Sequence, residues 1–556
     1  MSDFQQKFEN IKASRRAAVL SILEQKVSNE DGLQRIVRQI CAKYKVDCLE
    51  VKKSHLVSTY REMSAGNQIS KSEIFERLLT KRRIRTMSGV SVISVMTKPM
   101  GCPGNCVYCP SPARMPKSYL ENQPAAMRGV MNDFDPYEQV RSRLIMLDKM
   151  GHDISKNEMI VLGGTFSAHP VKYQELFIKR CFDAFNNYKL SNNIVGAGLK
   201  PARTESIRPD VANIPNSLSE AKKINETADC RLIGLTIETR PDYITPTEAK
   251  WLRYLGVTRV ELGVQSVFDD VLNLVKRGHN VEKVKEATAI LRQAGFKIVY
   301  HIMPGLPGTS IERDKQMFRL LFSDPGFYPD HLKIYPTVVL ENSELFNVWQ
   351  KGEYKPYQED DLIKLFGQIK PNIPPWVRIV RLMRDIPNNS IVDGVKTSNL
   401  RQKLHDSGVN CNCIRCREPK GESIADLKLI RRSYHVRGGQ EIFLSYESID
   451  DKKILALLRL FIPQGENELM KTISEIDKAA LVRELHTYGQ VVGINKSSEG
   501  VSQHQGWGKK LMQIAEEEVR EAGYKKMAVI AGVGVRQYYQ KLGYKLVGEY
   551  MVKSLV

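Results

Sequence analysis

Two groups of closely spaced cysteines are the residues in this sequence that most directly suggest chemistry. The first group spaces Cys102, Cys106 and Cys109 as C-x3-C-x2-C, with an aromatic residue directly before the last cysteine. Three thiolates on one short loop suit three corners of a [4Fe–4S] cube and leave the fourth iron without a protein ligand. Such an open position can bind a substrate or cofactor directly, as in catalytic zinc sites. The alternative is a structural zinc ion with a distant fourth ligand.

The second group, Cys411, Cys413 and Cys416, has the spacing C-x-C-x2-C. Three thiolates this close together predict a tetrahedral structural zinc site, for which His405 is a candidate fourth ligand. A second iron–sulfur cluster is the alternative. The N-terminus carries charge and lacks the apolar core of a signal peptide, so we expect metal ligands in a cytoplasmic protein and not disulfides.

Length and charge narrow the class of protein further. At roughly 150 residues per domain, 556 residues predict three to four domains. No apolar run approaches the ~18 residues of a membrane span, so we expect no membrane partner. The net charge is +20, and residues 1–100 hold 19 Lys and Arg against 10 Asp and Glu. An excess of this size indicates a polyanionic partner, most often nucleic acid, although a solvated basic surface is the alternative.

Strands and helices alternate along the centre of the chain. Strands are expected at residues 90–96, 159–162, 232–238, 259–262, 297–302, 332–335 and 377–380. Helices are expected between them, at 137–150, 281–294 and 314–322 among others. This α/β rhythm predicts a parallel sheet that forms a partial TIM-like barrel. The first cysteine group directly follows the first strand, so we place it at the C-terminal mouth of the barrel, where such folds carry their chemistry.

We divide the chain into four segments. They are a basic helical segment (1–80), the barrel (81–385), a linker with the cysteines of the predicted zinc site (386–425) and a last domain (426–556). Within the barrel, the polar stretch 190–228 is expected to be a long loop or an added helical piece. The last domain is expected to hold strands at 441–446, 454–461, 480–485, 491–494 and 527–531 and a helix at 507–522.

Small and polar residues follow several of the expected barrel strands. They are Gly163, Gly164, Thr165, Glu238, Arg240 and Gln265. Glycines let a backbone approach a ligand closely, and the ends of successive barrel strands converge at the mouth. These residues either bind a ligand there or belong to a plain buried polar network.

The cysteine spacing C-x3-C-x-aromatic-C on the first strand–helix loop resembles the radical S-adenosylmethionine (SAM) superfamily. This resemblance implies that the open iron binds SAM, and that an electron from an unidentified donor cleaves it to a 5′-deoxyadenosyl radical. It further implies that Gly163 and Gly164 contact the SAM amino group. Arg240 would then pair with the SAM carboxylate and Gln265 with its ribose, while Thr165 and Glu238 complete the cofactor site.

A glycine pattern opens the helix of the last domain. Gln503, Gly506 and Gly508 form Q-x-x-G-x-G, a nest of backbone N–H groups that favours a pyrophosphate at a helix N-terminus. With the strands around it and Tyr539 further on, this order resembles the GCN5-related N-acetyltransferase (GNAT) family, whose ligand is acetyl-CoA. The alternative is a glycine-rich turn beside a core tyrosine pair.

The pairing of these two domains resembles the Elongator catalytic-subunit family, including its stand-alone archaeal and bacterial forms. The similarity runs from about residue 87 to the C-terminus, through segments such as 163–166, 236–243, 333–337 and 532–536. It implies formation of 5-carboxymethyluridine at the wobble uridine of tRNA from acetyl-CoA, with the anticodon stem-loop as partner and a homodimer as one possible assembly. Members of that family often have a longer gap between the first two cluster cysteines than the three residues found here.

The family resemblance also assigns residues to ligands. The implied acetyl-CoA contacts are Lys156, Glu484, Leu485, His486, Thr487, Trp507, Gly508, Lys509 and Tyr539. Among them Lys156, Glu484 and Tyr539 are the expected catalytic residues, although spacing alone would make Lys156 an exposed loop lysine. For the tRNA backbone we expect Lys81, Arg82, Arg83 and Arg85.

Two other classes of function fit parts of the sequence. A protein lysine acetyltransferase with a structural iron–sulfur cluster would use Glu484 as a general base and would need no SAM. A non-catalytic tRNA-binding scaffold would need neither ligand. Both leave the complete cysteine triad and the glycine motif without a role, so a tRNA-modifying enzyme is the interpretation that uses all of the motifs.

Overall fold

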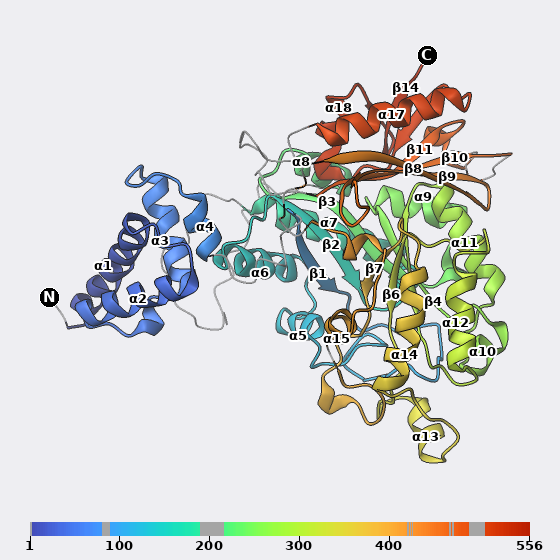
Figure 1. Cartoon of the computed structure of the whole chain (residues 1–556), viewed down its shortest axis with the longest axis horizontal. Coiled ribbons are helices and arrows are strands. Elements are labelled where there is room, and N and C mark those ends of the chain that lie inside the picture. Colours follow the sequence, from blue (N-terminus) through green and yellow to red (C-terminus); the bar gives the residue numbers. More distant parts are fainter. Residues whose placement is uncertain are drawn as a thin grey trace.

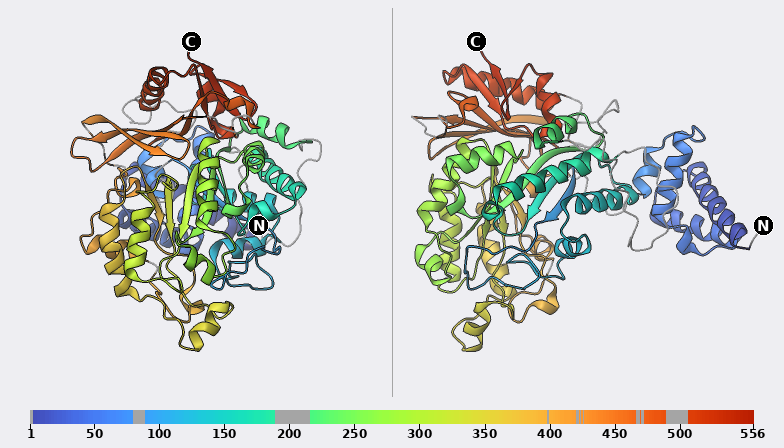
Figure 2. Two further views of the ribbon diagram at one scale, coloured as in Figure 1. Left: turned by 90° about the vertical axis from the view of Figure 1, so that its right-hand side faces the viewer. Right: turned by 180° about the vertical axis from the view of Figure 1, so that it is seen from behind.

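The computed structural model begins with a separate group of helices. It describes residues 3–79, 89–188, 216–397, 399–419, 422, 424, 426–465, 469, 472–488 and 506–556. The first of these ranges holds α1 (Asp3–Glu24), α2 (Glu30–Tyr44), α3 (Lys53–Ala65) and α4 (Glu73–Leu79). These helices bury their own apolar core and stand to one side of the other domains (Figures 1 and 2). An ion pair of 2.5 Å between Arg61 and Asp148 joins them to the next domain.

Seven parallel strands form the central sheet, in the spatial order of the sequence. The strands are β1 (Ser91–Met96), β2 (Lys156–Leu162), β3 (Arg231–Thr239), β4 (Arg259–Gln265), β5 (Lys297–Ile302), β6 (His331–Ile334) and β7 (Arg378–Arg381). Among the described strands β1 and β7 each have one neighbour, so the sheet is an open half-barrel (Figure 1). The expected α/β fold with a partial TIM-like barrel is confirmed, and each expected barrel strand overlaps an observed one.

The described segments between the strands form helices, most of which cover the outer face of the half-barrel. They are α5 (Pro124–Met131), α6 (Pro136–Lys149), α7 (Val171–Asn187), α8 (Leu218–Asn225), α9 (Pro246–Tyr254), α10 (Asp269–Leu274), α11 (Val281–Gln293), α12 (Ile311–Leu320), α13 (Glu344–Gln350) and α14 (Glu359–Ile369). Of these, α13 projects away from the sheet (Figure 1). Polar caps fix where several of them begin: Asp135, Asn280 and Ser310 each accept a hydrogen bond from a backbone N–H in the first turn. The connection from β1 to α5, residues 97–123, is long and carries the first cysteine group.

The two faces of the sheet differ in polarity because successive side chains of a strand point to opposite faces. Val260, Tyr300 and Leu332 face the helices and are buried in the main core. Their neighbours Glu261, His301 and Lys333 point into the half-barrel, where their side chains meet across β5. Branched apolar residues dominate the interior of an ordinary barrel, so this charged interior indicates a space built for polar ligands.

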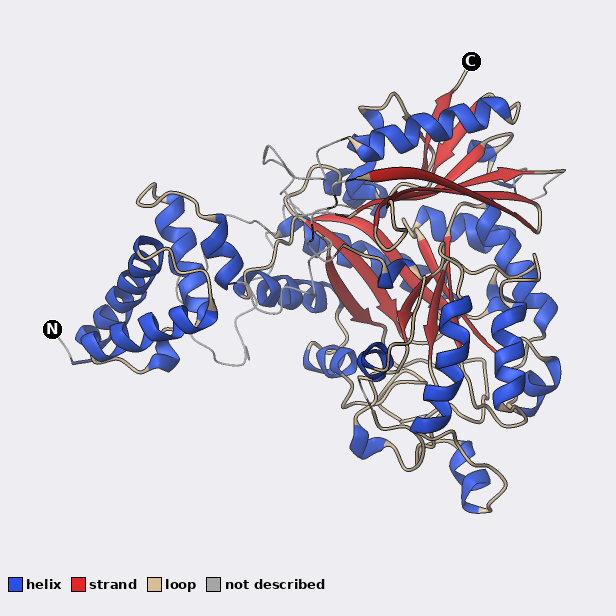
Figure 3. Cartoon of the chain, viewed as in Figure 1, coloured by secondary structure: helices blue, strands red, loops and turns tan. Residues whose placement is uncertain are grey.

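A second, mixed sheet follows in the order β13-β14-β12-β11-β10-β9-β8. Its strands are β8 (Leu427–Val436), β9 (Gly439–Ser448), β10 (Ile454–Pro463), β11 (Ala480–Thr487), β12 (Lys526–Val529), β13 (Lys545–Val547) and β14 (Tyr550–Ser554). The helices α17 (Trp507–Glu521) and α18 (Arg536–Gln540) pack beside it (Figure 3). The sequence analysis missed β8, β13 and β14. The edge strand β8 carries exposed charges such as Arg431, and β13 is exposed along its whole length, so neither shows the apolar pattern of a buried strand.

The segment that links the two sheets along the chain, and that carries the second cysteine group, packs onto the half-barrel. Its helix α15 (Leu400–Asp406) buries Leu400 and Leu404 in the main core. The domain boundaries after residues 80, 385 and 425 remain predictions. The strand expected at 491–494 and the basic residues Lys81, Arg82, Arg83 and Arg85 lie outside the described residues, as does much of 190–228. Among the helices described, none is long and apolar enough to cross a membrane.

Buried ion pairs attach the second sheet to the base of the half-barrel, where the parallel strands begin. Arg483 of β11 donates to both carboxylate oxygens of Asp330, at 3.1 and 2.5 Å, and Asp330 is 1% exposed. Arg483 also donates to Glu441 of β9. A buried charge is tolerated only when it is paired, so each domain supplies the charge that the other requires. The contact between the two domains also requires a glycine at position 532. A Cβ there would lie 1.9 Å from the carbonyl oxygen of Ile233 in β3, so no larger residue fits.

We predict that Asp330→Asn lowers the free energy of unfolding by about 3–5 kcal/mol, because it removes a buried carboxylate that both Arg483 and Arg459 share. Chemical denaturation measures this change. The matched control is Asp270→Asn, which breaks the exposed pair with Arg313 and is expected to cost less than about 1 kcal/mol. Equal effects of the two substitutions would contradict the assignment.

The same pair predicts a pH dependence. The arginines hold the pKa of Asp330 at about 2 despite its burial. The stability that it contributes is therefore complete above its ordinary pKa of about 3.9 and is lost as the pH falls toward 2. The Asn variant should lack this component of acid destabilisation.

Candidate active site

The first cysteine group lies on the loop after β1, at the C-terminal mouth of the half-barrel. Cys106 is buried, and Cys102 and Cys109 are half-buried. Two backbone hydrogen bonds of Val107, the residue after Cys106, hold the loop in place. Val107 donates to the carbonyl of Val275 (3.2 Å) and accepts from the N–H of Leu345 (2.7 Å). Burial, together with the neighbouring Cys106, raises the pKa of Cys109 to about 11, so binding of a metal there must displace a proton.

The spacing of the thiols distinguishes the two cysteine groups, both of which lie in the described part of the chain. The sulfurs of Cys411, Cys413 and Cys416 all lie within 4.8 Å of one another, whereas those of the first group form no such tight set. One zinc ion with Zn–S bonds of about 2.3 Å draws its thiolates to within about 3.8 Å of each other. Ligands to three separate corners of a cube lie further apart than ligands to one zinc ion, so the tight grouping of Cys411, Cys413 and Cys416 suits a single ion and the first group does not show that grouping.

The glycine pair after β2 lies beside this loop. Gly163 and Gly164 have φ angles of 144° and 88°, which side chains rarely allow. A Cβ at Gly163 would come within 1.9 Å of the hydroxyl oxygen of Thr97. The next residue, Thr165, places its hydroxyl 3.8 Å from the sulfur of Cys102. The structure therefore brings the predicted glycine motif into direct contact with the predicted cluster site.

Arg240 follows β3 and reaches the same loop. Its guanidinium binds Asp242 at 2.9 Å, yet its Nη1 is buried without a hydrogen-bond partner. A Cβ at Gly104 would lie 2.3 Å from this Nη1, so the free N–H group faces the cysteine loop. An unsatisfied buried donor costs about 1–3 kcal/mol, and an anionic ligand such as the SAM carboxylate would satisfy it. Glu238, two residues earlier, accepts a hydrogen bond of 2.5 Å from Tyr119.

Gln265 ends β4 in a strained conformation. Its φ angle is 72°, and the pairing of β4 with β5 is irregular between Gly263 and Gln265. Its side-chain carbonyl oxygen is buried and has no partner. A left-handed residue other than glycine costs roughly 1–2 kcal/mol and is retained where it aims a functional group. The residues that the superfamily resemblance assigned to SAM thus converge at the mouth, and two of them offer unused hydrogen-bonding groups.

The sequence analysis missed the charged group inside the half-barrel. Glu261 accepts hydrogen bonds from His301 Nε2 (2.8 Å) and from the ammonium of Lys333. Burial would raise the pKa of Glu261, but Lys333 and His301 hold it well below its ordinary value. The signal that could have revealed this group is that charged residues such as Glu261, His301 and Lys333 interrupt otherwise apolar strands.

Several of the expected acetyl-CoA residues also lie together in the last domain, which holds the second sheet and is called the second domain below. A Cβ at Gly508 would lie 2.9 Å from the hydroxyl of Tyr538, and Thr487 and Leu485 follow within 3.8 Å. Trp507 packs against Tyr446 with the ring centroids 4.5 Å apart, and Lys509 is exposed. The start of α17 and the end of β11 therefore lie together, as a CoA-binding site of this fold requires.

Tyr539, on α18, is buried in the core of the second domain and packs edge-on against Tyr538, with centroids 5.2 Å apart. Burial raises the pKa of its hydroxyl, which stays protonated at neutral pH. At this position the residue can donate a proton or a hydrogen bond and cannot act as an anion.

The carboxylate of Glu484 is held at the domain interface. It accepts from Arg459 at 2.8 Å and lies 3.3 Å from Lys297 at the start of β5. Although burial opposes the charge, Lys297 and Arg459 keep the pKa of Glu484 well below its ordinary value. A carboxylate held in this way is a weak base. The beginning of β2 is close to the same interface: Lys156 pairs in register with Arg231, whose guanidinium donates to Gln537 of α18 at 3.4 Å.

The second cysteine group is anchored beside β7 through a backbone hydrogen bond of 2.9 Å from the N–H of Ile414 to the carbonyl of Val377, which directly precedes the strand. Hydrogen bonds among the three thiols lower the pKa of Cys413 and raise the pKa values of Cys411 and Cys416, which shows that the three sulfurs lie in direct contact. His405, the candidate fourth ligand, is not part of the tight group; its side chain is 78% exposed and lies 3.5 Å from Asp406.

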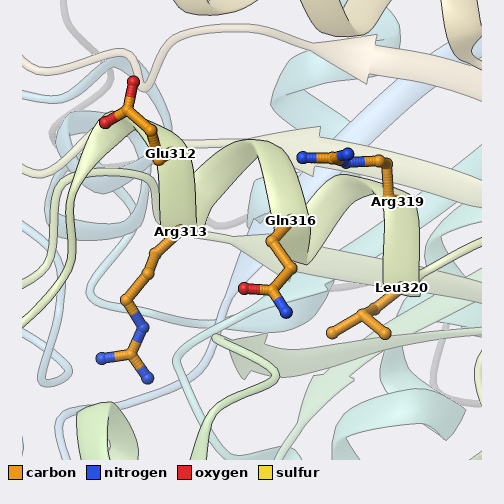
Figure 4. Close-up of a pocket in the computed structure, with 5 residues that line it drawn as sticks. All are labelled: Glu312, Arg313, Gln316, Arg319 and Leu320. Carbon is orange, nitrogen blue, oxygen red and sulfur yellow. The ribbon is translucent and has the colours of Figure 1, made fainter.

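A surface hollow lies elsewhere, along one exposed helix. Its lining residues Glu312, Arg313, Gln316, Arg319 and Leu320 all come from α12 (Figure 4). Arg313 is already paired with Asp270 at 2.7 Å. A depression that one helix lines brings together no groups from different elements, so the candidate active site remains the mouth of the half-barrel and the domain interface.

Comparison with known proteins identifies radical SAM and acetyltransferase domains in this chain. Residues 97–321 match the radical SAM superfamily, 329–407 the radical SAM C-terminal domain and 499–554 the acetyltransferase (GNAT) domain. A tRNA uridine(34) acetyltransferase of Methanocaldococcus infernus is 45% identical over 86% of this chain and 88% of its own length. The human Elongator complex protein 3 is 40% identical over 86% of both chains. A solved structure of the archaeal M. infernus Elp3 covers 84% of this chain and 99% of its own, with 42% identity and a TM-score of 0.70.

A half-barrel with a three-cysteine loop at its mouth, joined to an acetyltransferase sheet, defines a radical SAM protein with a GNAT domain. The chain belongs to the family of the tRNA uridine(34) acetyltransferases and Elongator complex protein 3. Membership of the radical SAM superfamily implies a [4Fe–4S] cluster and SAM, which the sequence spacing of the first cysteine group and the unpaired Arg240 donor fit.

We predict that Gly163→Ala weakens SAM binding at least tenfold while the iron content is unchanged. The added methyl group would collide with Thr97 and push the backbone away from the ligand. Calorimetric titration of the reconstituted protein with SAM measures the affinity. The control is Gly367→Ala on α14, where a Cβ meets no atom within 4 Å. Wild-type affinity in the Gly163 variant would exclude this loop from the SAM site.

Proposed function

We propose that this protein forms 5-carboxymethyluridine at the wobble uridine of tRNA, using acetyl-CoA and SAM. The observation that carries the proposal is that one rigid interface joins the GNAT fold to the base of the half-barrel whose mouth carries the cysteine loop, with a charged interior between the two. Arg483 and Asp330 connect the domains through buried charges. Relatives with 43–45% identity are named tRNA uridine(34) acetyltransferases, and the product is inferred from the chemistry that the two domains together supply.

The hardest step is removal of hydrogen from the acetyl methyl group, which no acid–base side chain can perform. The cluster and SAM, when bound, supply the carbon radical for this step. The chain's own residues bind and orient. Cys102, Cys106 and Cys109 hold the cluster, and the free Nη1 of Arg240 would receive the SAM carboxylate. Gly163 gives the backbone the close approach that the amino group needs.

The charged interior of the half-barrel would position the reacting groups. Glu261, His301 and Lys333 form a bonded cluster below the mouth, with Glu238 close by. Such fixed charges cost little reorganisation during a reaction and stabilise polar groups such as a uracil carbonyl or a thioester oxygen. Attachment of the acetyl methyl carbon to C5 of the uracil ring would replace the C5–H bond, with that hydrogen leaving as a proton and one electron returning to the external redox partner. Hydrolysis of the thioester would then release CoA and leave the carboxylate of the product.

At the second domain, Gly508 and the start of α17 would receive the CoA pyrophosphate. Tyr539, protonated because it is buried, would donate toward the thioester. We assign Glu484 a role in positioning at the interface, because its carboxylate already forms ion pairs with Arg459 and Lys297. Lys156 would reach the CoA from the barrel side. An external one-electron donor is part of this proposal.

The decisive experiment is a single anaerobic reaction. Reconstituted protein, SAM, reductant, acetyl-CoA and bulk tRNA are combined, and the nucleosides are analysed by mass spectrometry. We expect 5-carboxymethyluridine with the wild type. With Cys106→Ala we expect its loss, because the cluster loses one of its three thiolates, while calorimetry still detects acetyl-CoA binding.

The same reaction tests the alternative of a protein lysine acetyltransferase. That function predicts transfer of acetyl groups to protein without SAM, and full activity of the Cys106 variant. The low pKa of Glu484 argues against it, because this carboxylate would be a poor base. Modified uridine in the Cys106 variant would refute the radical mechanism.

We further propose that Cys411, Cys413 and Cys416 hold one structural zinc ion. The close grouping of their sulfurs supports a single ion, and the anchorage of this segment beside β7 supports a bracing role between the domains. Because bound zinc stabilises only the folded form, its removal is expected to lower the melting temperature.

We predict that Cys413→Ala lowers the zinc content from about one ion per chain to near zero and leaves the iron content unchanged. Elemental analysis by mass spectrometry measures both metals. His405→Ala serves as the matched variant, and it is expected to retain zinc because the imidazole is exposed and apart from the sulfurs. Zinc retained in the Cys413 variant would show that the ion is bound elsewhere or not at all.

A further inference from the structure

A second buried arginine, Arg277, contacts the cysteine loop beside Arg240. Its Nη1 donates to the sulfur of Cys106 at 3.5 Å. Its Nε and Nη2 donate to the carbonyl oxygen of Gly263, at 3.2 and 2.5 Å. The residue is 6% exposed, so this positive charge faces the sulfur with little screening by water.

The surrounding chain is shaped to hold Arg277 in this place. Lys276 and Gly278, on either side of it, have left-handed φ angles of 53° and 79°. The carbonyl of Val275 accepts the backbone N–H of Val107 from the cysteine loop itself. At Gly263 a Cβ would lie 2.6 Å from Nη2 of Arg277, so a larger residue would displace the guanidinium.

The two arginines at the loop differ in how their N–H groups are used. Arg240 keeps a buried Nη1 without a partner, which suits a ligand that arrives from outside. For Nη1 of Arg277 the sulfur of Cys106 is the acceptor that the structure provides. A guanidinium aimed at a cysteine sulfur is a poor arrangement for a neutral thiol, which is a weak acceptor, and a favourable one for a thiolate.

We propose that Arg277 raises the reduction potential of the cluster by donating a charged hydrogen bond to the thiolate of Cys106. Reduction adds a negative charge to the cluster and its ligands. A nearby buried positive charge stabilises that state more than the oxidised state, and hydrogen bonds to cluster sulfurs are a known means of setting the potential. Arg277 is thus a positioning and tuning residue. The inference rests on the proposed function only in requiring that the cluster is present.

The test is a redox titration of the full-length, anaerobically reconstituted protein, followed by electron paramagnetic resonance without SAM, tRNA or acetyl-CoA. We expect the midpoint potential of Arg277→Gln to be lower than that of the wild type. At the wild-type midpoint, its ratio of reduced to oxidised cluster should fall at least threefold, which corresponds to about 30 mV at 59 mV per factor of ten. Arg277→Lys, which keeps the charge, should shift less.

The control variant Arg313→Gln removes an exposed charge that is paired with Asp270 and should leave the potential unchanged. An unchanged midpoint in Arg277→Gln at full iron content would overturn the proposal. Loss of iron from both Arg277 variants would overturn it as well, in favour of a role in assembly alone. If the wild type shows no cluster signal, the proposed function fails; if only the potential is insensitive, the inference about Arg277 fails by itself.

Discussion

The buried contact between Asp330 and Arg483 is the interaction on which the arrangement of this protein depends. It joins the beginning of β6 to the middle of the second sheet, and neither charge has water to solvate it. Glu441 and Arg459 extend the network on the second domain. If the domains moved apart, a charge would remain buried without its partner, which is strongly unfavourable. The network therefore fixes one relative position of the domains. The two ligand sites are therefore held at constant separation.

This fixed frame explains how two unrelated kinds of chemistry can serve one reaction. The half-barrel presents its cysteine loop, its glycine pair and Arg240 at the mouth, and its charged interior leads from there toward the strand beginnings. At that end Lys297 meets Glu484 of the second domain. The polar groups thus follow the strands from one site to the other, on the face of the sheet that an ordinary barrel fills with branched apolar residues.

Much of the fold was predictable because each central strand is apolar on its helix-facing side and is separated from the next by a capped helix. The cysteine loop, the glycine pair and Arg240 were predictable because their spacing or their place after a strand is distinctive. The interior group of Glu261, His301 and Lys333 was not, since the sequence does not show which strands lie opposite one another. Arg277 was missed for the same reason: its partner sulfur lies 171 positions away along the chain.

The glycine at position 532 has a consequence for how such a protein can change over time. Its backbone lies so close to the carbonyl of Ile233 that no side chain fits between them, so the surface of the acetyltransferase domain is shaped to match the half-barrel. An acetyltransferase domain from an unrelated protein, put in place of this one, would lack both the glycine at this contact and the arginines that pair with the half-barrel. Shuffling of ready-made modules is thereby restricted, and the two parts are expected to have diverged as a single inherited unit.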